Sequence, residues 1–187
     1  MRRLLLAVLL LGAALAQATE PNARRVVALA PSLSEIMVEL GAAERLVGVL
    51  DGGPRLPALA HLPSLGRHGQ LNLEVLLSLQ PDLVLLWPDS VGPAMHAQLR
   101  TLGIPLIEAQ PHDLDELAGQ LAAIGAAVGH GAEGERLAAR MRAGIAALRA
   151  RYAGSAPLAV FYQVWDRPMY TLGGRQIISD ALRLCGA

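Results

Sequence analysis

Lysine is absent from the 187-residue sequence, cysteine occurs once, and aromatic residues are rare. All 16 basic residues are therefore arginines, and they balance 16 acidic residues without gathering into a basic cluster. Such a chain is not expected to bind nucleic acid, because that requires a concentrated positive surface. The one thiol, Cys185, cannot form an internal disulfide, and its isolation excludes metal sites built from paired cysteines.

The common signatures of enzymes are missing as well. No G-x-S-x-G elbow, Walker loop or G-x-G-x-x-G motif follows any of the apolar runs. The five histidines include no H-x-H or H-E-x-x-H pair, which would place two metal ligands on one helix face. We therefore expect no enzyme activity, no metal site and no cofactor.

One long apolar run is present, from Leu4 to Ala16, behind the basic pair Arg2-Arg3. We predict that residues 1–18 are a cleavable signal peptide, since the run is short for a membrane anchor, which is the alternative. Cleavage would leave 14 basic and 16 acidic residues, a formal charge near −2. No cysteine lies near the cleavage site to carry a lipid, so the mature protein is expected to be a free periplasmic monomer.

After this leader, short apolar runs alternate with helical patterns. Strands are predicted at residues 25–30, 46–50, 82–87, 105–109 and 158–165. Helices are predicted at residues 32–40, 73–79, 94–102, 113–128, 133–152 and 176–184. The predicted caps are Ser32 with Glu35 for the first helix, Asn72 for the second, and Asp113 with Glu116 for the fourth. Residues 51–70, rich in glycine and proline, are predicted to form a long functional loop. Strand–helix alternation requires parallel strands with helices on both faces, so the predicted fold class is α/β.

The order of these elements predicts a division of the chain. Residues 24–130 are expected to form a Rossmann-like N-terminal lobe with a parallel sheet, and residues 131–153 a long connecting helix. Residues 156–187 supply one strand and one helix of a second α/β lobe. One such pair cannot bury both faces of a sheet. We therefore expect this second lobe to be incomplete and the chain to be truncated.

Polar and aromatic residues follow the predicted strands. These residues are Ser32, Gly52, Trp87, Gln110 and Trp165. In open parallel sheets, ligands bind outside the carboxyl ends of the strands. A second interpretation is that the two tryptophans only close the edge of the sheet.

Several segments then carry a family resemblance. The sequence from Val26 to Glu35 (VVALAPSLSE) is similar to the opening of periplasmic binding proteins for cobalamin, haem and ferric siderophores. Further similarities are LVGV at 46–49, LNLE at 71–74 and PDLVLLW at 81–87. The segments at 160–171 (VFYQVWDRPMYT) and 178–186 (ISDALRLCG) resemble the cobalamin-binding branch. The resemblance covers residues 24–187.

The resemblance implies two lobes joined by one stiff helix, with a large ligand held between them and delivered to an ABC importer in the inner membrane. Trp87, Trp165 and Tyr170 would form aromatic walls, and Ser32 and Gly52 would lie at strand ends beside the ligand. Glu74 falls where an acidic residue of the family docks with the permease. Such a protein binds its cargo without transforming it.

Two departures keep alternatives open. Family members often carry a tyrosine where this chain has Gly52, and a tryptophan that stacks on the corrin where it has His68. His68 could instead reach a haem iron. Haem or a ferric siderophore is therefore the alternative cargo. Two further alternatives stay open. The protein could be a secreted α/β hydrolase that uses Ser32, or a fragment that binds nothing because half of its cleft is absent.

Overall fold

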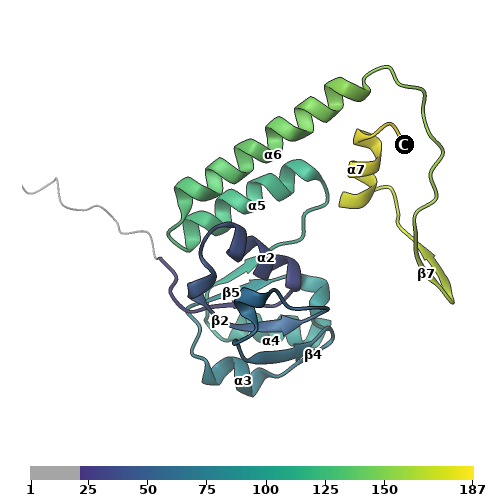
Figure 1. The fold of residues 1–187 in the computed structure, drawn as a ribbon. Helices are drawn as coiled ribbons and strands as arrows, with labels where there is room; N and C mark the ends of the chain where they lie inside the picture. Colours follow the sequence, from purple (N-terminus) through teal and green to yellow (C-terminus); the bar gives the residue numbers. More distant parts are fainter. Residues whose placement is uncertain (1–21) are drawn as a thin grey trace, which may run out of the picture.

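The computed structural model describes residues 22–187, and the predicted signal peptide lies outside that range. A six-stranded sheet in the order β4-β3-β2-β1-β5-β6 forms its centre (Figure 1). The strands are β1 (Val26–Ala28), β2 (Leu46–Asp51), β3 (Ser64–Arg67), β4 (Gln70–Leu71), β5 (Leu83–Leu86) and β6 (Leu106–Glu108). All neighbours pair in parallel except β3 and β4, which are antiparallel. The predicted α/β class with a mostly parallel sheet is confirmed.

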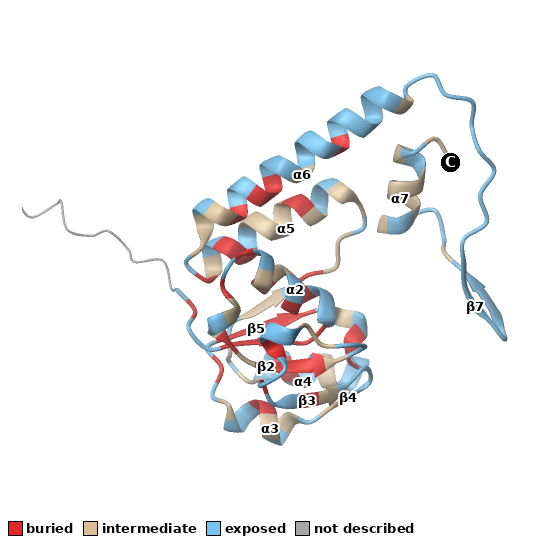
Figure 2. Ribbon diagram, viewed as in Figure 1, coloured by how far each residue is buried: buried red, intermediate tan, exposed pale blue. Residues whose placement is uncertain are grey.

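Helices cover both faces of this sheet. The helices are α2 (Pro31–Glu39), α3 (Leu73–Ser78), α4 (Pro93–Thr101), α5 (Leu114–Ala127) and α6 (Gly131–Tyr152). Val26 and Ala28 belong to a core shared with α2, α5 and α6, whereas Val27 and Leu29 belong to a second core shared with α3 and α4. Successive residues of a strand point to opposite faces, so a central strand covered on both sides must be apolar throughout. Figure 2 shows this buried sheet between its helical layers.

The chain continues from α6 into a much less buried part. Its elements are β7 (Gln163–Asp166), β8 (Met169–Thr171) and α7 (Ile177–Leu184). β7 and β8 form an antiparallel hairpin whose residues are all exposed (Figure 2). Residues 22–152 are called the first unit below, and residues 156–187 the second. The predicted domain boundaries agree with these elements in outline and stay predictions.

Three local predictions are wrong. Ser32 does not cap α2, because the helix already begins at Pro31, with Ala30 at the cap position. Proline suits the first helical position, where its missing N–H removes a donor that has no partner there. Residues 51–70 are not one loop, since they contain β3, which gains its hydrogen bonds from β2. The predicted strand at 158–165 begins only at Gln163 and pairs antiparallel with β8.

The remaining helices agree closely with their predicted ranges. Asn72 caps α3, where its Oδ1 accepts from the Val75 N–H at 3.1 Å. Asp113 caps α5 in the same way, accepting from the Glu116 N–H at 2.7 Å. Within residues 22–187, no helix has both the length and the apolar character needed to cross a membrane.

Candidate functional site

A cleft of about 270 Å³ opens at the carboxyl edge of the sheet. Ser32 comes from the start of α2, and Trp87 follows β5 directly. β1 and β5 are parallel neighbours, with Val26 opposite Leu83, so the segments that leave them emerge side by side. The first unit thus brings together two residues that the sequence predicted, 55 positions apart, at the edge where parallel sheets bind ligands.

The cleft combines an aromatic face with polar side chains. The Trp87 residue is 39% exposed, which leaves its ring free to contact a ligand. Beside it, the Gln110 side-chain amide donates to Asp89 Oδ2 at 2.8 Å, which fixes the orientation of that amide. An apolar wall with a few oriented polar groups is the usual composition of a small-molecule site.

The second unit also contributes a wall to this cleft. Gln176 and Ile177, at the start of α7, line the same cleft as Trp87. Sequence reasoning missed both residues, and it missed Asp89 and Gln120 as well. No local signal could have identified Gln176. Its place at the cleft depends on the course of the chain through α6 and the hairpin, which precede α7 in the sequence.

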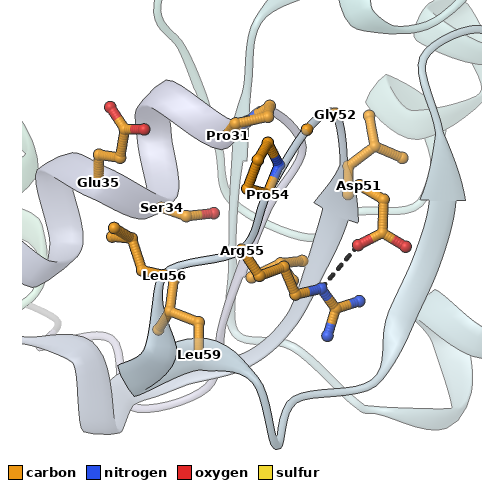
Figure 3. A pocket seen from close by; sticks show the side chains of 12 residues that line it. Pro31, Ser34, Glu35, Asp51, Gly52, Pro54, Arg55, Leu56 and Leu59 are labelled. Carbon is orange, nitrogen blue, oxygen red and sulfur yellow. Dashed lines mark hydrogen bonds and ion pairs between the residues drawn. The ribbon is translucent and has the colours of Figure 1, made fainter.

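Gly52 lies in a separate, much smaller pocket (Figure 3). A Cβ atom at Gly52 would lie 2.7 Å from Pro31 Cγ, so the close approach of the loop to α2 requires glycine. The pocket holds about 30 Å³, space for roughly one water molecule, and is too small for a large ligand.

An ion pair stiffens the loop around that pocket. Arg55 Nε lies 2.7 Å from Asp51 Oδ1, and Arg55 also donates to the Leu62 carbonyl at 2.6 Å (Figure 3 shows the ion pair). The Ser64 hydroxyl donates to the second oxygen of Asp51. These hydrogen bonds, that of Arg55 first, lower the pKa of Asp51 from its ordinary value of 3.8. The carboxylate therefore stays charged and holds the loop in place.

Besides Gly52, four predicted residues lie outside the cleft. His68 is exposed in the turn between β3 and β4, and Glu74 is exposed in the first turn of α3. Trp165 and Tyr170 are cross-strand neighbours in the hairpin, 60% and 58% exposed. Their roles toward a ligand or a permease stay predictions.

The described residues offer no group of three or more His, Cys, Asp or Glu side chains that could hold a metal ion. His112 belongs to the cleft lining, but its ring lies 3.3 Å from Glu116 Oε2 at the start of α5. The arrangement is one that can enclose and orient an organic molecule between two walls.

Comparison with known proteins shows which family has this architecture. A family model described as periplasmic binding protein matches residues 26–187. The vitamin B12-binding proteins of Vibrio cholerae serotype O1 and Yersinia pestis are 32% and 30% identical to the chain over 164 residues, 88% of its length. The chain spans 59% of the length of these relatives.

Solved structures give the same result. The periplasmic vitamin B12-binding protein of Vibrio cholerae superposes with a TM-score of 0.81 at 32% identity, over 88% of this chain and 64% of that one. The periplasmic haem-binding protein of Roseiflexus sp. RS-1 superposes with a TM-score of 0.69 at 31% identity, over 89% of this chain and 65% of that one. The fold is therefore one that its relatives use for two different large tetrapyrrole-type ligands.

Proposed function

The chain belongs to the periplasmic binding protein family, and from that premise we propose that it binds cobalamin or a related corrinoid in the periplasm for delivery to an ABC importer. The observation that carries the proposal is the cleft at the carboxyl edge of the sheet, which Ser32 and Trp87 of the first unit line together with Gln176 of the second. The names of the relatives 32% and 30% identical to the chain support cobalamin as the cargo.

The size of the cleft fits one part of such a ligand. Ligand pockets commonly measure about 300–1,000 Å³, and the 270 Å³ of this cleft lie just below that range. A corrin ring would place one edge against Trp87, while the rest of the ligand would extend beyond the walls that residues 22–187 provide. We therefore expect the 187-residue chain to bind cobalamin weakly.

A titration followed by visible absorbance tests this proposal. Cyanocobalamin is added to the purified chain, and saturable one-to-one binding is expected. Trp87→Ala should remove most of the spectral change. Trp165→Ala serves as the matched control, because Trp165 lies in the hairpin outside the cleft. Failure of cyanocobalamin to saturate any response would contradict the proposal.

Haem is the second candidate, supported by the similarity to the Roseiflexus haem-binding protein. Haemin titrated under the same conditions separates the two, because bound corrinoid and bound haem have different spectra. Saturation by haemin alone would assign the cargo to haem, and the His68→Ala variant would then show whether that imidazole contributes. Binding without turnover is proposed in either case, and the family match favours it over hydrolysis by Ser32.

Docking to the importer is proposed to involve Glu74. Its carboxylate is exposed at the start of α3. An exposed charge mainly accelerates the encounter with an oppositely charged partner. Glu74→Gln should therefore lower cobalamin uptake by proteoliposomes that carry a cobalamin ABC importer, with unchanged cobalamin affinity. Equal uptake with both forms would remove Glu74 from the interface.

A further inference from the structure

One hydrogen bond connects the two units. The backbone N–H of Leu114 in α5 donates to Asp180 Oδ2 in α7 at 3.1 Å. Within residues 22–187, no other hydrogen bond or ion pair joins residues 156–187 to residues 22–152. The partners are 66 positions apart in sequence. This contact is thus the one polar tie within residues 22–187 that fixes the position of α7 against the first unit.

The bond uses a donor that a helix cannot satisfy by itself. Leu114 is the first residue of α5, a helix of 14 residues, and the first N–H groups of a helix have no partner inside it. Asp113 satisfies the N–H of Glu116, which leaves that of Leu114 for Asp180. A carboxylate at this end of a helix is also favoured by the helix dipole. Asp180 therefore completes the capping of α5 from a different unit.

The Asp180 side chain is oriented within its own unit. Arg183, one turn further along α7, lies 3.3 Å from the other carboxylate oxygen. The same guanidinium donates to the Gly174 carbonyl at 2.7 Å, just before α7 begins. The Asp180 side chain is 29% exposed, whereas that of Arg183 is 54% exposed, so water reaches the pair mainly from the arginine side. The carboxylate is thus set in place before it meets α5.

The same helix supplies the second wall of the cleft. Gln176, at the N-cap of α7, and Ile177, its first residue, precede Asp180 by four and three positions, so both lie within about one helical turn of it. Both line the cleft that contains Trp87. We propose that Asp180 is a positioning residue, which latches α7 to the start of α5 and so holds Gln176 and Ile177 against the ligand. Its part in ligand affinity rests on the proposed function.

The hydrogen bond between Leu114 and Asp180, called the latch below, can break and form again. If α7 moved away, water could satisfy the Leu114 N–H, because that residue is partly exposed. A hydrogen bond to a charged group is worth enough to change binding roughly tenfold when it holds one wall of a site. The bond therefore favours the position that α7 has in the structure, without fixing α7 there permanently.

The single cysteine of the chain allows a direct test. Cys185 is exposed at the end of α7, so a nitroxide attached there reports how freely α7 moves, with or without ligand. The variants are Asp180→Ala, Asp180→Asn and, as the matched control, Asp166→Asn, whose carboxylate forms an ion pair with the adjacent Arg167. Electron paramagnetic resonance is recorded on each labelled chain, and cyanocobalamin affinity is measured on each unlabelled chain.

Asp180→Ala should sharpen the nitroxide spectrum and weaken cyanocobalamin binding roughly tenfold. Asp180→Asn keeps an oxygen that can accept from Leu114, so it should restore most of the ordered spectrum. Asp166→Asn should change neither measurement. An unchanged spectrum in Asp180→Ala, or no restoration by Asp180→Asn, would overturn the proposal. If the spectrum responds as expected but no variant binds cyanocobalamin, the latch stands and the proposed function fails.

Discussion

Gly125 of α5 and Gly134 of α6 pack backbone against backbone. A Cβ atom at Gly125 would lie 2.9 Å from the Cα of Gly134, and one at Gly134 would lie 2.8 Å from the Leu121 carbonyl oxygen. Both glycines are buried. The contact sets how closely the two helices approach, and with it the direction in which α6 carries the chain toward the second unit (Figure 1).

Gly134→Ala should destabilise the protein although alanine is the better helix former. The gain in helix propensity is about 1 kcal/mol. Overpacking a tight contact costs about 1–3 kcal/mol, and here the contacted atoms belong to the backbone, which cannot move aside easily. Gly144→Ala is the matched control on the same helix, because nothing lies within 4 Å of its Cβ position. Urea unfolding should therefore show a lower midpoint for Gly134→Ala and a raised one for Gly144→Ala. A raised midpoint for both would refute the packing argument.

Asp51→Asn should destabilise the first unit at pH 7 and lose that effect in acid. Hydrogen bonds from Arg55 and Ser64 lower the pKa of the folded carboxyl below 3.8, the ordinary value that applies in the unfolded chain. The charged form stabilises the fold, so its contribution is fully present above pH 3.8 and is lost as the pH falls through the lowered pKa. Unfolding of both proteins is measured between pH 7 and pH 2.

The control for this prediction is Arg55→Gln. It removes the strongest hydrogen bond to Asp51, so its stability difference from the wild-type protein should shrink over the same acidic range. A difference between wild type and Asp51→Asn that is constant from pH 7 to pH 2 would show that the carboxylate charge does not matter.

Ligand binding should quench one tryptophan and leave the other unchanged. Trp87 lines the cleft, whereas Trp165 lies in the hairpin. In Trp165→Phe, which retains Trp87, cyanocobalamin should quench most of the fluorescence at saturation. In Trp87→Phe, saturable quenching should largely disappear. The opposite pattern would move the ligand to the hairpin, where the sequence analysis predicts Trp165 as an aromatic wall.

The exposed apolar side chains of the second unit should make the chain self-associate. Large apolar side chains are exposed between residues 158 and 170, among them Phe161 at 63% and Met169 at 64%. Contiguous apolar surface of this kind promotes association. We expect the chain to bind the dye ANS and to self-associate with rising concentration in sedimentation experiments. The Phe161→Ser and Met169→Ser double variant should weaken both effects, whereas Leu77→Ser, on the isolated exposed leucine of α3, should leave them nearly unchanged.

The predictions that succeeded depend on short stretches of sequence. The cap at Asn72 and the cap at Asp113 were both predicted, because a side chain that bonds to an amide three residues on needs no distant partner. The cap at Ser32 failed for an equally local reason, the preference of Pro31 for the first helical position. β3 could not be predicted, since its four residues include Gly66 and its hydrogen bonds come from β2.

The sequence by itself determined the alternation of strands and helices, the apolar central strands and the long helix α6, because periodicity and capping act over a few residues. Only the tertiary structure decided that Ser32, Trp87 and Gln176 line one cleft, and that Trp165 lies in a hairpin outside its lining. The first relationship follows from the pairing of β1 with β5, and the bond between Leu114 and Asp180 joins the unit that carries Gln176 to the first unit. Both join residues far apart in the chain, and no local pattern encodes which distant partners will meet.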